Sequence, residues 1–597
     1  MQVQRTILWV VFTMSLLFLW DGWQRHQGKP SMLSGEPAVQ KAPDASQAAA
    51  AATGGTPGAA APASGAVPTA PAVTSGAAAV PGAVPAQPAP APVAIGNTPA
   101  SELIAFSSDT LALKIDPVGG QVRRAELLRH NAGSETVGPN NGRVVLLHDD
   151  PGRVYVAQSG LVGAPVGASF PTHRTPFTVA EGPRALQGDA KAVELVLSAE
   201  SGGVRLKRTY RLERGSYVIG VRDEVVNIGD APVRPTLYMQ LTRNAEFTSE
   251  ADLKGRNNSA LSFFTAGAVT YAGPVVYTEE KKFQKIDFAD IEKKKAEFVK
   301  SASDGWAGLI QHYFVSAWLP TDKAPREYYA NRVDNNLYAI GALQPLAEIA
   351  PQASAVSETR LLVGPQDQRM LESIAPGLDL SVDYGWLTPL AKPIFWLLEM
   401  CHRLVGNWGW AIVLLTIIIK TLFFPLQAAS YKSMARMKAV TPRMMQIRER
   451  YGNDRAKMNQ AMMELYQQEK INPLGGCLPI VVQIPVFIAL YWVLLASVEM
   501  RNAPWLGWIQ DLAVPDPWFI LPAVMAGTMF IQVKLNPTPP DPLQARIMMI
   551  MPLVFSVMFF FFPAGLVLYW LVNNIYSIAQ QWYITKAIEK AAAAKRA

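Results

Sequence analysis

An apolar run from Trp408 to Gln427, reading WGWAIVLLTIIIKTLFFPLQ, constrains the chain more than any other feature. A helix needs about 20 predominantly apolar residues to cross a bilayer, and this run has that length and composition. Its exception is Lys420, which follows at least ten residues suited to the membrane. A lysine near the centre of a span costs about 2.5–3.5 kcal/mol on insertion scales. The run therefore predicts a membrane protein with a cation inside a span.

Lys420 has two interpretations. A charge kept inside a membrane usually faces a wet cavity, a partner charge or a substrate path, and Thr416 lies on the same helical face four residues earlier. Alternatively, the lysine stem reaches back to the interface and has no further role. Phe423, Phe424 and Leu426 still follow it, so that reach is long. We favour a functional lysine.

The N-terminal region predicts an anchor and a tether. Residues 6–20 are apolar, and no small-residue cleavage site follows them closely, so residues 1–23 are expected to remain as a transmembrane anchor. Residues 24–100 are rich in Ala, Pro and Gly, with no charged residue between Asp44 and Glu102. Such a composition cannot bury a core, and it predicts a disordered tether.

Residues 101–375 have the composition of a water-soluble β domain. Apolar and polar residues alternate along 193–198, 204–212, 217–226 and 233–242, with turn residues between them, which predicts a large β-sandwich. One lysine-rich helix is expected from Ala289 to Lys300.

The remaining chain alternates between apolar and polar segments. The predicted segments are an interfacial amphipathic helix (380–406), transmembrane helix 2 (407–430), a cytoplasmic helical hairpin (431–472), transmembrane helices 3–6 (473–585) and a basic cytoplasmic tail (586–597). Within 473–585 the four spans are expected at 477–498, 518–534, 547–562 and 564–584. The second hairpin helix is expected to start from Asn453 as its N-cap.

Charge sets the expected orientation. Residues 431–470 carry nine Lys or Arg and four Asp or Glu, whereas the loop 501–517 has one basic residue against two acids. Cytoplasmic loops carry the excess of Lys and Arg. With six spans, both termini and the hairpin are predicted to be cytoplasmic, and the β domain to be periplasmic.

The hairpin is unusually rich in methionine. Two interpretations stay open: the methionines join its two helices, or they form an adaptable face for varied apolar partners. The methionines considered for the second role are Met434, Met437, Met444, Met445, Met458 and Met462.

The sequence lacks the motifs that several classes of protein need for their function. The sequence has no phosphate-binding loop, nucleophile elbow or metal-ligand spacing, so no cofactor or metal is expected. No basic surface interleaved with aromatics indicates nucleic-acid binding. The predicted spans hold no mid-membrane carboxylate for a proton-coupled transporter. We expect a protein that is not an enzyme and whose Lys420 meets something anionic that enters the membrane.

Four motifs of the sequence resemble those of a known family. GNWGWAIVLLTIIIK, YKSMARMKAVTPRMMQIRERYGND, NPLGGCLPIVVQIPVFIALYW and FPAGLVLYWLVNN resemble the YidC/Oxa/Alb family of membrane-protein insertases. The anchor, tether and β domain resemble its Gram-negative bacterial form, located in the inner membrane. The resemblance implies a polytopic α-helical protein with a five-helix insertase core, a periplasmic β-supersandwich and a cytoplasmic hairpin.

The resemblance also implies function and partners. The chain would insert and help fold inner-membrane proteins, alone or with the Sec translocon, and would meet nascent membrane proteins, ribosomes and the lipid bilayer. Its substrate groove would be lined by Lys420, Thr416, Gln483, Phe487, Tyr569 and Trp570. Two positions depart from the family pattern: Lys420 stands where bacterial members usually have Arg, and Trp570 where Tyr is common. Lys420 keeps the charge but loses the bidentate fork.

The alternative function is an envelope enzyme that handles lipid or sugar and uses the β domain. Glu246, Glu250 and Asp252 lie close together in the sequence, and Asp304 lies near Trp306. Paired carboxylates can cleave sugars, but scattered surface acids are far commoner. Deleting the β domain would abolish such an enzyme and spare an insertase.

The two cysteines test the topology. Cys401 and Cys477 are predicted to lie at opposite membrane faces, so they cannot form a disulfide with each other. A non-reducing gel of the purified protein should show the same mobility as a reducing gel. An internal disulfide between them would overturn the predicted orientation.

Overall fold

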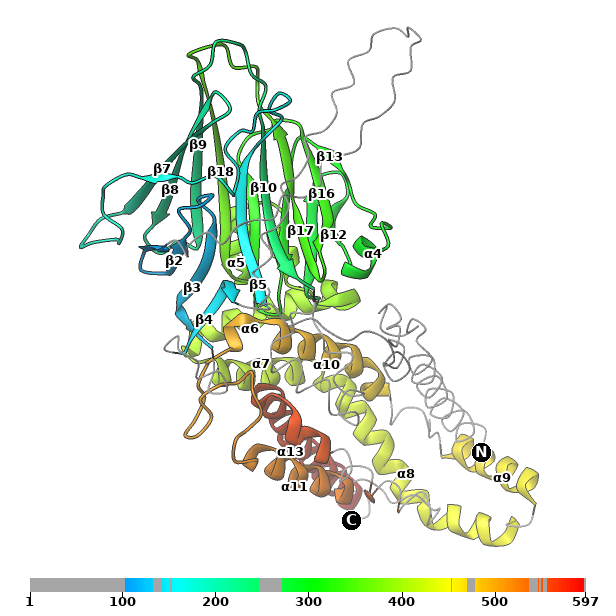
Figure 1. Cartoon of the computed structure of the whole chain (residues 1–597). Helices are drawn as coiled ribbons and strands as arrows, with labels where there is room; N and C mark the ends of the chain where they lie inside the picture. Colours follow the sequence, from blue (N-terminus) through cyan, green and yellow to red (C-terminus); the bar gives the residue numbers. More distant parts are fainter. Residues whose placement is uncertain are drawn as a thin grey trace, which may run out of the picture. The chain divides into compact units, whose positions relative to one another are not determined.

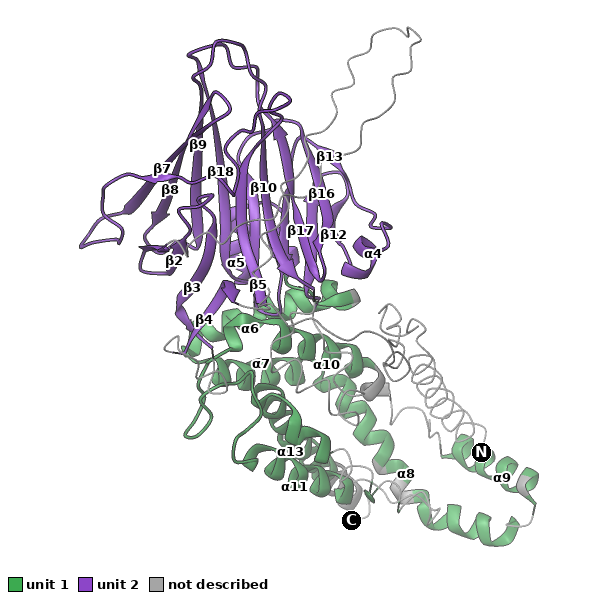
Figure 2. Cartoon of the chain, viewed as in Figure 1, with its two compact units in different colours: residues 1–43, 382–597 green, residues 44–381 purple. Residues whose placement is uncertain are grey.

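The computed structural model describes residues 102–132, 142–150, 153–245, 271–451, 454–469, 478–535, 546, 549–550 and 556–594. The predicted anchor 1–23 and tether 24–100 lie outside these residues. The chain divides into two compact units: residues 44–381 form one, here called the β unit, and residues 1–43 with 382–597 form the other, the α unit (Figure 2).

The described residues of the β unit form two sheets of nine strands each (Figure 1). In order across the sheet, sheet 1 contains β1 (Ile104–Ser107), β2 (Leu111–Ile115), β3 (Val122–Asn131), β4 (Arg143–Asp150), β5 (Arg153–Val162), β10 (Thr236–Asn244), β17 (Leu337–Pro345), β16 (Arg326–Asp334) and β13 (Ser301–Ala302). Sheet 2 contains β12 (Lys282–Lys285), β11 (Gly273–Thr278), β14 (Trp306–Ile310), β15 (Phe314–Pro320), β18 (Ser354–Pro365), β9 (Val218–Asn227), β8 (Val204–Glu213), β7 (Ala192–Ser201) and β6 (Thr178–Val179).

Alternation along the strands explains the sandwich. In β8, every second residue from Val204 to Leu212 is buried while most of those between are exposed. Most buried apolar side chains of the two sheets join one hydrophobic core. Period-two alternation places successive side chains on opposite faces of a sheet. The expected β-sandwich is therefore confirmed. The strand β10 differs, because all but its last residue are buried and both of its faces are covered.

A buried ion pair within sheet 2 is linked by hydrogen bonds to sheet 1. The guanidinium of Arg208 in β8 meets the carboxylate of Asp223 in β9, with Nε 2.7 Å from Oδ1 and Nη2 3.1 Å from Oδ2. Its Nη1 donates to the backbone oxygens of Gly119 and Ser159, both on the side of sheet 1. Removing one member of such a pair leaves an uncompensated buried charge, which costs about 3–5 kcal/mol.

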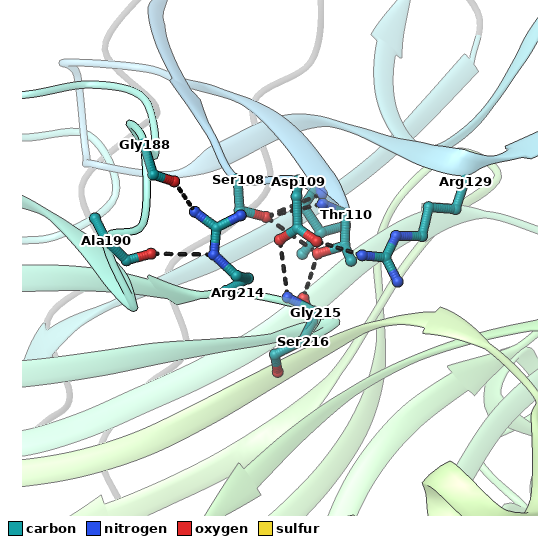
Figure 3. Close-up of polar contacts among 10 residues, drawn as sticks. Ser108, Asp109, Thr110, Arg129, Gly188, Ala190, Arg214, Gly215 and Ser216 are labelled. Carbon is teal, nitrogen blue, oxygen red and sulfur yellow. Dashed lines mark hydrogen bonds and ion pairs between the residues drawn. The ribbon is translucent and has the colours of Figure 1, made fainter.

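Polar contacts also join the sheets at one edge (Figure 3). Asp109, in the turn between β1 and β2, pairs with Arg129 and accepts a hydrogen bond of 2.8 Å from the backbone N of Gly215, in the turn between β8 and β9. Beside it, the Thr110 hydroxyl donates to the backbone oxygen of Ser216 at 2.5 Å. These bonds connect the first hairpin of sheet 1 to a hairpin of sheet 2.

Two sequence expectations of local structure are wrong. The helix expected from Ala289 to Lys300 is only α4 (Phe288–Glu292), because three adjacent lysines follow and Lys294 has a φ of 54°, which ends an α-helix. The N-cap of the second hairpin helix is Asp454 and not Asn453; its carboxylate accepts hydrogen bonds from the backbone N of Ala456 and Lys457. The β unit ends with α5 (Gln368–Ile374) and η1 (Leu378–Ser381).

The α unit is helical. Its described elements are η2 (Gly385–Leu387), α6 (Thr388–Val405), α7 (Trp408–Leu422), α8 (Phe424–Tyr451), α9 (Arg455–Gln468), α10 (Leu478–Ala496), η4 (Val498–Met500), α11 (Ile520–Leu535), η5 (Phe559–Phe561) and α13 (Ala564–Ala594). Among the described residues, no single helix has both the length and the apolarity for a full membrane crossing. Helix α7 and the first part of α8 have them together, across a bend of 64°.

The β unit should lose stability in acid through His148. Burial, and then the positive charges of Arg153, Arg243 and Arg124, lower the pKa of His148 to about 3. An unfolded histidine titrates near 6.5, so below that pH the unfolded chain binds a proton that the folded β unit excludes. The contribution of His148 to the free energy of unfolding is fully present above pH 6.5. It falls by up to about 1.4 kcal/mol per pH unit as the pH is lowered from 6.5 to 3.

The measurement is the melting temperature of the β unit in the full-length protein as a function of pH. His148→Phe retains a ring against Tyr155, whose ring centre lies 6.2 Å away, and removes the titration. Its pH profile should be flatter than that of the parent between pH 6.5 and 4. Parallel profiles would show that His148 does not contribute.

Candidate functional site

Lys420 lies near the C-terminal end of the apolar helix α7. The Asn407 side chain starts α7 by accepting a hydrogen bond of 3.1 Å from the backbone N of Trp410, and the helix ends at Leu422, one residue before α8 begins in a new direction. Lys420 therefore lies in the last turn before the bend. Its side chain is almost fully buried, with 3% of its surface exposed.

Side-chain oxygen atoms from two other helices approach the ammonium group. Lys420 Nζ lies 2.8 Å from the hydroxyl oxygen of Ser577 in α13 and 3.5 Å from Oε1 of Gln483 in α10. The same Gln483 oxygen accepts a 3.4 Å bond from Gln427 in α8, and Gln483 Nε2 donates to Asn573 Oδ1 at 2.8 Å. We call these five residues the Lys420 network.

The Lys420 network contains no negative charge. Within the described part of the chain, no carboxylate forms an ion pair with Lys420, and its neighbours are neutral hydroxyl and amide groups. Neutral oxygens replace part of the water that a lysine loses on burial, but they leave its charge uncompensated. Such a site favours an anionic group that comes from outside the protein.

Thr416 lies on the Lys420 face but outside the network. Its hydroxyl donates a 2.7 Å hydrogen bond to the backbone oxygen of Ile412, four residues earlier in the same helix. The side chain is buried, with its one donor already used. Thr416 thus lies on the same helical face as Lys420, as its spacing predicts, but its hydroxyl group is already used by a hydrogen bond within α7.

Aromatic rings from α10 and α13 form a second cluster. The ring of Phe487 lies 4.6 Å from that of Trp570, edge to face, and 6.0 Å from that of Tyr569. Among the described residues, the indole nitrogen of Trp570 is buried without a hydrogen-bond partner. Because Gln483 is one turn before Phe487, this cluster continues from the Lys420 network along α10 and α13.

Sequence reasoning missed Gln427 and Ser577. Ser577 follows Asn573 by four residues and so shares its helical face, and its hydroxyl donates 2.7 Å to the backbone oxygen of Asn573. The repeating polar positions of α13 were a usable signal. Gln427 lies just beyond the bend, and no pattern in the sequence shows that α8 turns it back towards Gln483.

The structure places the hairpin methionines in different environments. Val440, Met444 and Leu465 form a small core between α8 and α9, with Met437 and Met462 packed against it. Met445 is exposed, and Met434 and Met458 are half-buried. Three of the six methionines therefore help to join the two helices, and the others keep surface that a partner could contact.

The loop from Arg501 to Phe519 holds the N-terminal ends of two helices, α7 and α13. Asn407 donates a 2.9 Å bond to the backbone oxygen of Pro504, and the indole of Trp505 packs directly on Gly409 at the start of α7. The backbone N of Ala564 and of Gly565, at the start of α13, donate to loop carbonyl groups at 2.8 and 2.9 Å.

The buried carboxylate of Asp516 attaches the same loop to a third helix. It accepts hydrogen bonds from the indole nitrogen of Trp508 at 2.9 Å and from the backbone N of Leu521, at the start of α11, at 2.7 Å. One loop thus fixes α7, α11 and α13 at the ends remote from Lys420.

The carboxylates considered for an enzyme do not form a site in the described residues. Glu246, Glu250 and Asp252 lie outside them, and Asp304 accepts a 3.4 Å bond from the backbone N of Glu279. No group of three or more His, Cys, Asp or Glu that could hold a metal occurs in the part of the chain that is described. Cys401 is a buried free thiol, whereas Cys477 is outside the described residues.

Two protein-family models together match most of this chain. Residues 400–591 match the family described as 60Kd inner membrane protein, and residues 103–397 match the YidC periplasmic domain. The membrane protein insertase YidC of Bordetella pertussis is 53% identical over 100% of this chain and 99% of its own length. That of Cupriavidus necator is 52% identical with the same coverage. A crystal structure of an active YidC insertase covers 81% of this chain at 15% identity, with a TM-score of 0.37.

The contact between Trp505 and Gly409 leads to a stability prediction. A Cβ atom added at Gly409 would lie 2.2 Å from Cδ1 of Trp505, so Gly409→Ala should displace the loop at a cost of about 1–3 kcal/mol. The melting temperature of the α unit in detergent should fall, and Trp505→Ala in the same chain should restore part of it.

Gly527→Ala is the matched control. Gly527 is also helical, and no atom lies within 4 Å of its added Cβ, so this variant should gain about 0.5–1 kcal/mol from helix propensity. If Gly409→Ala were as stable as Gly527→Ala, Trp505 would not hold the start of α7.

Proposed function

The chain belongs to the YidC family of membrane protein insertases, and from this premise we propose that it inserts membrane proteins by receiving their hydrophilic segments at Lys420. The observation that carries the proposal is a buried ammonium group with oxygen neighbours and no carboxylate partner among the described residues. An acidic segment would supply the missing negative charge for the time of its passage.

The attraction is strong because the site is shielded from water. Charges attract each other more in a low-dielectric interior than at a surface, so one carboxylate near Lys420 would be favoured even without fixed geometry. Ser577 and Gln483 accept hydrogen bonds from the ammonium group, and Gln427 bonds to Gln483. These three side chains would accept or donate hydrogen bonds as the segment moves. Thr416, Phe487, Tyr569 and Trp570 would line the same groove.

We propose the topology that charge indicates. Six spans would put the basic hairpin α8–α9 in the cytoplasm and the β unit in the periplasm, and the match of residues 103–397 to a YidC periplasmic domain supports the second location. Helix α6 supports an interfacial position, because Trp396, Met400 and Leu404 form an exposed apolar stripe opposite its buried face. The hairpin methionines would meet the incoming segment before Lys420 does.

The driving force is physical. Burial of the substrate's apolar segment in lipid stabilises the inserted state, and the membrane potential favours movement of an acidic tail to the outer side. We include nascent chains on ribosomes and the Sec translocon as proposed partners. The envelope-enzyme alternative is not favoured, since the full-length relatives are insertases.

A charge series at Lys420 tests this function. One substrate is given tails with two, one or no acidic residues, and its insertion into vesicles is measured with the parent, Lys420→Arg, Lys420→Ala and Lys420→Glu. Lys420→Arg should lose least, because arginine keeps the charge. Lys420→Ala should reduce insertion of the two-acid tail by tenfold or more if the lost attraction is about 1.4 kcal/mol, and Lys420→Glu should reduce it further.

The neutral tail is the internal control. It should insert at similar rates with the parent and Lys420→Ala, since it offers no charge to attract. If Lys420→Ala inserted all tails as the parent does, the charge of Lys420 would have no part in substrate reception.

A further inference from the structure

Gln580 in α13 is buried, and its side chain forms no hydrogen bond within the part of the chain that the structure describes. Its side chain is 6% exposed, and both its Nε2 and its Oε1 atoms lack a hydrogen-bond partner among the described residues. A buried polar group without a partner costs about 1–3 kcal/mol, so an apolar residue here would make the fold more stable. A polar residue at such a position needs another explanation.

Helical geometry places Gln580 beside the Lys420 network. It follows Asn573 by seven residues and Ser577 by three, so the three side chains share one face of α13. The Tyr431 hydroxyl donates to the backbone oxygen of Ser577 at 3.4 Å, which brings α8 to this stretch. Gln580 therefore extends the polar face by one turn beyond Ser577.

A second polar face of α13 has a structural use and makes the contrast clear. Asn574 donates to the hydroxyl of Thr528 at 3.5 Å, and Gln581 donates to the backbone oxygen of Leu535 at 3.2 Å. Both partners belong to α11, so these side chains hold two helices together. Gln580 is adjacent to Gln581 in sequence but makes no such bond.

We infer that Gln580 is a second substrate-binding residue, which binds neutral polar groups of the hydrophilic segment next to the charge that Lys420 attracts. A carboxamide carries donors and an acceptor, which is the pattern of a peptide group or of an Asn or Gln side chain. Polar groups of a passing segment lose their water, and an unpaired one costs free energy that this side chain would recover. The inference rests on the proposed insertase function.

A pair of neighbouring variants tests the inference. Gln580→Leu removes the orphaned polar atoms, so its melting temperature should equal or exceed that of the parent, while insertion of a substrate with an uncharged Asn- and Ser-rich tail falls about three- to tenfold. Gln581→Leu loses the bond to Leu535 and should melt at a lower temperature. Assayed below that temperature, it should insert the same substrate at the parental rate.

Disulfide crosslinking supplies a direct readout of contact. In a chain with Cys401→Ala and Cys477→Ala, Gln580→Cys should crosslink to a cysteine in the tail of a ribosome-stalled substrate, and Gln581→Cys should not. Crosslinking from neither position, or equally from both, would overturn the inference.

The same assays separate this inference from the proposed function. If the parent inserted no substrate, the insertase function itself would fail. If the parent inserted and Lys420→Ala impaired acidic tails, but Gln580→Leu matched the parent on the uncharged tail, only the role of Gln580 would fall. A Gln580→Leu variant that lost stability and insertion together would assign a structural role to Gln580 and also overturn the inference.

Discussion

A positive charge held among neutral oxygens is the constraint on which the α unit depends. Lys420 can remain charged in an apolar bundle only where several polar groups converge. Gln483 of α10 and Ser577 of α13 meet it, and Gln427 of α8 bonds in turn to Gln483. The bend after Leu422 allows this convergence, because it directs the start of α8 back towards α10. The charge, the bend and the polar neighbours form one arrangement.

The two ends of the bundle are held by different interactions. At the ends remote from Lys420, backbone N–H groups of α11 and α13 and the side chain of Asn407 at the start of α7 attach these helices to one loop. Near Lys420, the hydrogen bonds that the described residues form between α7, α10 and α13 join side chains to side chains. Backbone bonds fix a helix end, whereas amide and hydroxyl side chains can exchange partners. The bundle is therefore expected to yield to a substrate at the Lys420 end and to stay closed at the other.

The sequence was informative where periodicity or charge carried the signal. Alternation located β7 to β10, and the interruption of an apolar run identified Lys420. The sequence was misleading where the backbone conformation or the packing of distant segments decides the structure. The helix expected from Ala289 ends early, because the backbone has a positive φ at Lys294. Gln427 could not be predicted because the direction of α8 after the bend decides which helix it meets. Thr416 was on the correct face, but its own helix takes its hydroxyl group.

The strand order of sheet 2 has a consequence for synthesis. The strand β9 pairs along its length with β18, although β10 to β17 lie between them in the sequence. Pairing between such distant segments is slow, because a long loop must close before any contact compensates for it. During export, β9 stays unpaired on this edge until β18 (Ser354–Pro365) has crossed the membrane. The strand β18 is made late, because only a short stretch of chain separates it from the helices of the α unit. The β unit is thus most exposed to aggregation while it is being made, when its last strand is still missing.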